Sequence, residues 1–175
     1  MAMFVHIADA RKQRSLERSG IKPSGRKGEP GWGVYAMPVL PDYFISHQWL
    51  RELKRRGTKT MIGVYFRLPD REAVVVGHYN AAHAPMTAAR AVRVIMAASD
   101  ARGYEVVIPR KIEPVDIHAV RPIRQVVGWR YYPDAHGKYL CACPVCVPKG
   151  SIKSRRLREA FELSMDPEFR AGRVG

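Results

Sequence analysis

The sequence predicts an α+β fold built on a largely antiparallel sheet, and two observations support this. Several strand-like apolar stretches follow one another without a helix between them, whereas a doubly wound fold alternates strand and helix regularly. In addition, no G-x-G-x-x-G follows a strand and no P-loop is present, which argues against a Rossmann or kinase-type nucleotide site. With 175 residues, of which 46% are hydrophobic, the chain is long enough for one compact domain.

The charge balance is strongly basic. Lysine and arginine number 30 against 16 acidic residues, a formal net charge of +14. This excess favours a polyanionic partner, with nucleic acid first among them, although a basic surface can also serve solubility alone. No apolar run approaches the roughly 20 residues of a membrane span, and charges begin early in the chain, so we expect no signal peptide and a cytoplasmic location.

The first part of the chain predicts two strands and two helices. Residues 4–7 form a short apolar strand, and Asp9 begins a helix that Gly20 ends. Residues 22–31, rich in glycine and proline, predict a loop. A second strand covers residues 32–38, and a second helix covers residues 41–57, with basic residues near its C-terminal end.

The second part predicts four strands and a helix. Residues 59–69 and 72–79 flank a Pro-Asp-Arg turn and look like a hairpin, followed by a loop over residues 80–86. Thr87 begins a helix with Val92, Ile95 and Met96 on one face. A strand follows within residues 102–117, and residues 117–133 read as extended, with an interruption at Pro122.

Three polar residues stand inside strands that otherwise look buried. They are His6 in the first strand, Tyr35 in the second and Glu105 in the late strand within residues 102–117. With period two, Tyr104, Val106 and Ile108 share one face and Glu105 lies on the other. Each residue alone is more often structural, but together they could direct polar groups into one cleft.

Three stretches resemble ADP-ribosyltransferase-like domains: FVHIADARKQRSLERSGI, GWGVYAMP and GYEVVIPRKIEPVDI. These domains begin with a strand carrying a histidine, continue with a Gly-apolar-Tyr strand, and have a late strand with a glutamate before an apolar run. The segment from Arg102 to Glu105 is most similar to the nucleic-acid-directed DarT-like branch. The resemblance covers residue 4 to about residue 124. It implies split antiparallel sheets with flanking helices, as a core domain over residues 1–130.

The same resemblance implies an NAD⁺ site between two small sheets. His6 would bind the ribose and Tyr35 would stack on the nicotinamide ring. Basic residues such as Arg11 and Lys12 are placed where the pyrophosphate could be held, and the family pattern does not fix which of them serves. Glu105 would be catalytic, because a fixed carboxylate stabilises the positive charge that develops on the sugar as the nicotinamide leaves. The implied activity is NAD-dependent ADP-ribosyl transfer to nucleic acid or protein, in a toxin, a defence factor or a repair enzyme.

A related branch of this fold family removes a 2′-phosphate from RNA with NAD⁺ and relies on histidine and arginine clusters. His78 and His83 could belong to such a set, or could lie in the predicted hairpin and loop without a role.

A cysteine cluster follows the core, in a predicted second region over residues 131–175. Cys141, Cys143 and Cys146 form C-x-C-x-x-C, a spacing that can bring three thiolates to one zinc ion. His136, His118 or a water would be the fourth ligand, and three reduced thiols without metal are the alternative. A basic helix at about residues 151–164 follows. Zinc and the net charge together define a rival hypothesis, a non-enzymatic nucleic-acid-binding module.

Overall fold

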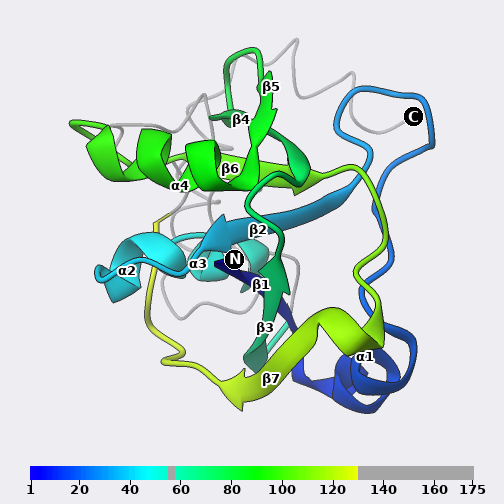
Figure 1. Ribbon diagram of the computed structural model, residues 1–175. Coiled ribbons are helices and arrows are strands. Elements are labelled where there is room, and N and C mark those ends of the chain that lie inside the picture. The colour runs from blue at the N-terminus through cyan, green and yellow to red at the C-terminus, as the bar shows by residue number, and fades with distance from the viewer. Residues whose placement is uncertain (55–57, 130–175) are drawn as a thin grey trace, which may run out of the picture.

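The computed structural model describes residues 1–54 and 58–129, and these residues form seven β-strands. The strands are β1 (Ala2–Asp9), β2 (Val34–Pro38), β3 (Met61–Leu68), β4 (Ala73–His78), β5 (Ala84–Thr87), β6 (Tyr104–Ile108) and β7 (Ile117–Pro122). They form one sheet in the order β5-β4-β6-β2-β1-β3-β7, and every pairing is antiparallel (Figure 1). The predicted α+β class with an antiparallel sheet is therefore confirmed.

Strand β2 changes partner along its length. Val34, Tyr35 and Ala36 pair with β6, whereas Met37 and Pro38 pair with β1. The sheet therefore consists of two halves, β5-β4-β6 and β1-β3-β7, which β2 joins. Figure 1 shows β2 running between the two groups of strands.

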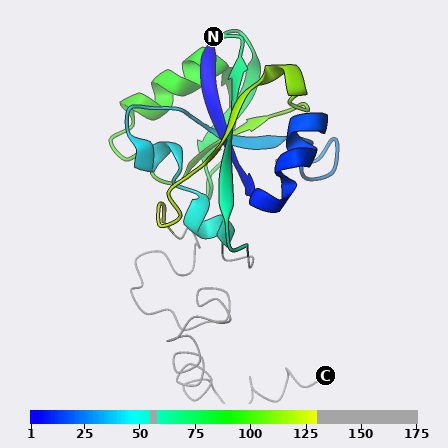
Figure 2. The ribbon, with the colours of Figure 1, turned by 90° about the horizontal axis from the view of Figure 1, so that it is seen from below.

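The described helices are short, and the predicted caps Asp9 and Thr87 each accept a hydrogen bond from the main chain that follows them. The Asp9 carboxylate accepts a hydrogen bond from the Arg11 amide, 2.9 Å away, and a 3₁₀ turn (Ala10–Lys12) then leads into α1 (Gln13–Ser19), which Gly20 ends. Thr87 caps α4 (Ala88–Ala97). Figure 2 shows α1 and α4 on opposite sides of the strands. None of the described helices has the length and apolarity that a membrane crossing requires.

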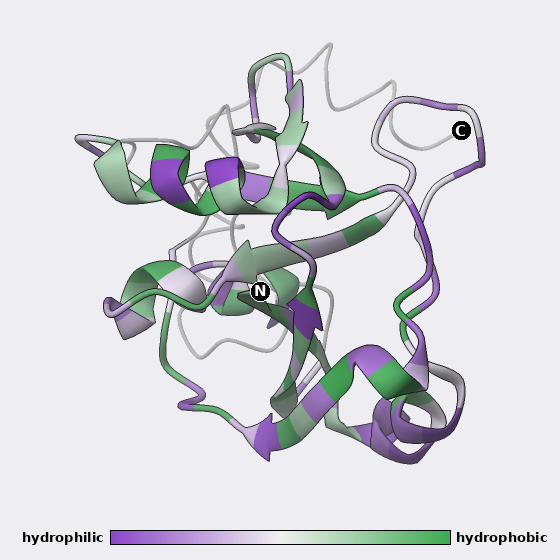
Figure 3. Cartoon of the chain, viewed as in Figure 1, coloured by the Kyte–Doolittle hydropathy of each residue, from purple (hydrophilic) through white to green (hydrophobic). Residues whose placement is uncertain are grey.

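The main core lies between α4 and one face of the sheet. Ala88, Ala91 and Ile95 of α4 are completely buried, and they belong to one cluster with the inward residues of β4, β6 and β2. Burial of a side chain such as Ile95 contributes about 1.5–3 kcal/mol. The expectation for Met96 is wrong, because it is 58% exposed and points away from this cluster. Figure 3 shows the strands mainly in hydrophobic colours and α1 mainly in hydrophilic ones.

The single helix predicted over residues 41–57 is instead two, α2 (Tyr43–Ser46) and α3 (Leu50–Lys54), and residues 55–57 lie outside the described part. The chain turns between them, where His47 and Gln48 are 2% and 0% exposed. Gln48 accepts a hydrogen bond from the Gly103 amide at 2.7 Å and donates one to the Ala101 carbonyl at 3.1 Å. The break lets two adjacent polar side chains reach buried partners, and buried polar groups need such partners.

The predicted hairpin of residues 59–69 and 72–79 is also wrong, although both strands exist. Strand β3 pairs with β1 and β7, and β4 pairs with β5 and β6, so the turn between them crosses from one half of the sheet to the other. Strand β3 is buried on both faces. Such an apolar pattern indicates a central strand, but it does not indicate which strands pair with it. The true hairpin is β4–β5, in the segment that we predicted to be a loop.

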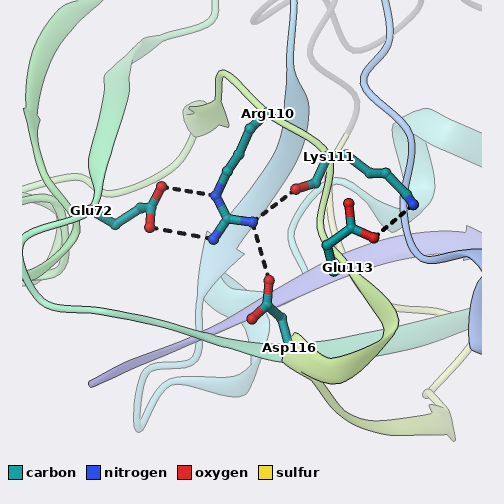
Figure 4. A network of polar contacts seen from close by, with 5 residues as sticks. All are labelled: Glu72, Arg110, Lys111, Glu113 and Asp116. Atoms are coloured by element: carbon teal, nitrogen blue, oxygen red, sulfur yellow. Dashed lines mark hydrogen bonds and ion pairs between the residues drawn. The ribbon is translucent and has the colours of Figure 1, made fainter.

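A network of ion pairs fastens the segment after β6 to the start of β4 (Figure 4). Arg110 meets Glu72 through two parallel hydrogen bonds, Nε to Oε1 at 2.9 Å and Nη2 to Oε2 at 3.3 Å. Its Nη1 also donates to Asp116 Oδ2 at 3.1 Å and to the Lys111 carbonyl at 2.8 Å. Because the arginine is only 34% exposed and its bonds are bidentate, this network stabilises the fold more than an ordinary surface pair does.

We predict that Arg110→Ala lowers the free energy of unfolding by roughly 1–3 kcal/mol, since it leaves two partly buried carboxylates without their cation. Urea denaturation followed by circular dichroism measures this. The control is Arg14→Ala on the exposed face of α1, which should change stability by less than about 0.5 kcal/mol. Equal effects of the two substitutions would show that the network adds nothing to stability.

Candidate functional site

Two of the predicted site residues lie on the face of the sheet that points away from α4. Tyr35 pairs with Val107 across β2 and β6, and Glu105 is two residues from Val107 on the same face. Side chains placed diagonally in this way are roughly 7–8 Å apart. The negative charge of Glu105 accordingly acts on the Tyr35 hydroxyl. The structure therefore brings these two residues together from distant parts of the chain.

Glu105 is held by a histidine from the turn between β4 and β5. His83 Nε2 lies 3.0 Å from Glu105 Oε1, and the two side chains are 22% and 19% exposed. Burial raises the pKa of Glu105, while the charge of His83, its hydrogen bond and the charge of His78 act in the opposite direction. Within residues 1–54 and 58–129, the other carboxylate oxygen, Oε2, makes no hydrogen bond.

Gly77 makes room for this histidine. It pairs with Glu105 across β4 and β6, so a side chain at position 77 would stand next to the carboxylate. A Cβ there would lie 2.8 Å from His83 Cγ and 2.9 Å from His83 Cα, closer than atoms can approach. The absence of a side chain at Gly77 is therefore what lets His83 lie against Glu105.

His6 lies at the point where β1 and β2 separate. The last residues to pair are Val5 and Met37, and the His6 ring then bonds the Tyr35 carbonyl, with Nδ1 and O 2.7 Å apart. A carbonyl can only accept, so Nδ1 carries a proton and Nε2 of the neutral ring is an acceptor. Among the described residues, no hydrogen bond to Nε2 is formed. Burial, together with the charge of Lys12, lowers the pKa of His6 and favours this neutral form.

Tyr35 offers its ring, while its hydroxyl is already bonded. The hydroxyl donates to the Gly31 carbonyl at 3.0 Å, and the residue is 36% exposed. Burial of the hydroxyl and the nearby charge of Glu105 both raise the pKa of Tyr35, so it stays a neutral donor. Gly31 has φ +82°, and a Cβ there would lie 2.8 Å from the hydroxyl, so this position requires glycine.

The loop that carries Gly31 is closed at its base. The Ser24 amide donates to the Gly33 carbonyl at 2.8 Å, and the Gly33 amide donates back at 3.1 Å. These two bonds join the ends of the loop immediately before β2. The base of the loop and the Tyr35 hydroxyl together fix the loop against the start of β2.

Arg11 is not part of this cluster. Its guanidinium binds Asp9 through Nε and Nη2, with the shortest distance 2.6 Å, and its side chain is 85% exposed. The cation whose charge reaches the site is the neighbouring Lys12, through its effect on His6. As a ligand for a pyrophosphate, Arg11 would first have to exchange its contact with Asp9.

His83 is the site residue that sequence reasoning did not place. The sequence pairs His83 only with His78, as members of a histidine and arginine cluster, whereas in the structure His78 bonds Asn80 and His83 bonds Glu105. The sequence does contain one signal for this contact, which is Gly77. A glycine inside an apolar strand often marks a place where another group approaches the backbone closely. The pairing of β4 with β6 was needed to identify that group.

The proposed zinc ligands Cys141, Cys143, Cys146 and His136 lie outside the described residues, so the zinc site stays a prediction. Within the described ranges, no group of three or more histidine, cysteine, aspartate or glutamate residues could hold a metal ion. The alternative fourth ligand, His118, is exposed on the edge strand β7.

Comparison of the chain with known protein families, with curated proteins and with solved structures gives no match. The chemistry of the site therefore has to be argued from its own residues.

We predict that the His6 imidazole titrates below the ordinary value of about 6.5, because burial disfavours its charged form. The unfolded chain then binds this proton more readily, so the free energy of unfolding decreases as the pH falls below about 6.5. NMR titration of the imidazole resonances tests this. His6→Gln, which keeps a donor for the Tyr35 carbonyl, identifies the signal and should flatten the pH dependence of stability. A midpoint at or above 6.5 contradicts the assignment.

Proposed function

We propose that this protein is an NAD-dependent ADP-ribosyltransferase. The observation that carries the proposal is that Tyr35 and Glu105 share one face of β2 and β6, while the His6 ring bonds the main-chain carbonyl of Tyr35 where β1 and β2 separate. Each residue leaves free the group that such chemistry uses: a ring face on Tyr35, an acceptor nitrogen on His6 and a carboxylate oxygen on Glu105.

The reaction breaks the bond between the nicotinamide nitrogen and C1′ of the ribose, and the bonding electron pair leaves with neutral nicotinamide. Positive charge develops on the ribose, and a carboxylate nearby stabilises that transition state more than the ground state. The acceptor then forms a new bond to C1′ and loses a proton, which Glu105 or solvent takes up. The described residues thus need to supply binding, orientation and one negative charge.

His6 and Tyr35 would orient the substrate. Neutral His6 can accept a hydrogen bond from a ribose hydroxyl through Nε2, and its other nitrogen is fixed by the Tyr35 carbonyl. The Tyr35 ring is held by Gly31, so stacking of the nicotinamide on its exposed face costs little rotamer freedom. Offset stacking of this kind is worth about 0.5–1.5 kcal/mol.

Glu105 would be the catalytic residue. Its carboxylate is only 19% exposed, and a charge in such a dry position acts more strongly on the ribose than one in water. The raised pKa of Glu105 also makes it a better proton acceptor than a solvated glutamate.

Nucleic acid is the acceptor class that the charge favours. The chain has a formal charge of +14, and its described part exposes many cations on α1 and the loop after it. Electrostatic attraction of this kind draws a polyanion to the surface and raises its local concentration at the site. From the 3₁₀ turn to this loop the exposed cations are Arg11, Lys12, Arg14, Arg18, Lys22, Arg26 and Lys27.

We predict that Glu105→Gln lowers the rate of nicotinamide release from NAD⁺ by about 10²–10⁴-fold, the usual effect of removing a catalytic charge. Incubation with nicotinamide-labelled NAD⁺ and single-stranded DNA, RNA or protein in separate reactions measures it. Glu17→Gln is the control, an exposed glutamate on α1 that should leave the rate unchanged. Equal rates for wild type and Glu105→Gln would refute the proposed function.

We further predict that nucleic-acid binding weakens by about tenfold or more between 50 and 200 mM salt, because phosphate contacts release counterions. Fluorescence anisotropy with labelled single-stranded DNA and RNA gives the affinity at each salt concentration. Binding that does not respond to salt, or no binding at low salt, would exclude nucleic acid and leave protein as the acceptor.

A further inference from the structure

The contact between His83 and Glu105 is not explained by folding alone. Both side chains are partly accessible, and Gly77 lacks the side chain that would exclude the histidine. The cost of a glycine within β4 is roughly 0.5–1 kcal/mol relative to alanine. The β4–β5 turn thus delivers an ionisable ring to one oxygen of the proposed catalytic carboxylate.

The second bond of the His83 ring fixes where its protons lie. Nδ1 is 3.1 Å from the Ala81 carbonyl, which can only accept, so Nδ1 carries a proton. The contact between Nε2 and Glu105 Oε1 therefore contains one further proton. The pair is either an imidazolium with a carboxylate or a neutral imidazole with a carboxylic acid. If that proton is lost, two lone pairs face each other at 3.0 Å, and the contact is no longer favourable.

We propose that His83 is a positioning residue for Glu105, which holds Oε1 through this shared proton and presents Oε2 to the ribose. This inference rests on the proposed function. When the pair is an imidazolium with a carboxylate, Glu105 keeps its negative charge in spite of burial. The other groups whose charge links them to the carboxylate are His78 from β4 and the Tyr35 hydroxyl from β2.

The sign of the effect follows from these contacts. Burial raises the pKa of Glu105 and His83 lowers it, so removal of His83 moves this pKa further up. If Glu105 must be ionised to act, the acid limb of the pH–rate profile then moves to higher pH. A histidine that only supported the fold would leave the limb where it is.

The experiment compares His83→Gln and His83→Ala with the wild type by two measurements. The first is the NMR titration of the Glu105 side-chain carboxyl, which needs no activity. The second is kcat and KM for nicotinamide release as a function of pH. We expect the carboxyl titration and the acid limb to move up together in both variants. We also expect kcat to fall about 10–100-fold in His83→Ala, which loses orientation, with partial rescue in His83→Gln, which keeps a hydrogen-bond donor.

Two further variants serve as a check and a control. Gly77→Ala keeps His83 but displaces it from Glu105, because the new Cβ would meet both the ring and the main chain of His83, so it should reproduce the shift of His83→Ala. Glu17→Gln, at an exposed glutamate on α1, should change neither measurement. Circular dichroism shows which variants are folded. If a His83 variant is misfolded, the titration of Glu105 in Gly77→Ala tests the positioning role instead.

The outcomes separate the two proposals. If the carboxyl titration does not move in the variants while the wild type releases nicotinamide, the positioning role is overturned and the proposed function stands. If the titration moves but the wild type does not cleave NAD⁺, the proposed function is wrong and the positioning role falls with it. If the carboxyl titration and the acid limb of the pH–rate profile both move, the proposed function and the positioning role of His83 are both supported.

Discussion

The arrangement of this protein depends on the change of partner within β2. A strand in an antiparallel sheet satisfies its main-chain groups by pairing on both sides, and a strand that leaves one neighbour must find other partners. In β2 the pairing with β1 is confined to Met37 and Pro38, and the His6 ring donates a hydrogen bond to the Tyr35 carbonyl where the two strands separate. The candidate site thus lies where the regular ladder is interrupted, and a side chain there completes the main-chain bonding.

The histidines show how a structural ring differs from an available one. His47 is buried and uses both nitrogens, Nδ1 with the Tyr43 carbonyl at 2.9 Å and Nε2 with the Tyr65 hydroxyl at 2.8 Å. His6 uses one nitrogen within the described residues, so the second is left for a ligand. Both nitrogens of His83 are hydrogen-bonded, but the partner of Nε2 is the titratable carboxyl of Glu105. The number and chemistry of a histidine's partners, more than its burial, therefore separate support from function.

The sequence predicted those features that depend on local patterns. Asp9 and Thr87 were identified as caps from their own type and position, and the two faces of β6 followed from its period of two. Features that depend on distant partners were missed. The helix breaks at His47 and Gln48, whose side chains bond Tyr65 and Gly103. Strands β3 and β4 do not form a hairpin because β3 pairs with β1 and β4 pairs with β6. For the same reason Glu105 could be selected from sequence, whereas its contact with His83 could not.

The closed base of the loop between Ser24 and Gly33 has a consequence for how this protein can change. Paired bonds at the base hold the loop's two ends together, so the length of the segment beyond them is uncoupled from the position of β2. Insertions between Gly25 and Glu29 would extend the tip without shifting Tyr35, because loop closure costs rise only slowly with length. New contacts to a different acceptor could thus be acquired there by variation of loop length, with the proposed chemistry left intact.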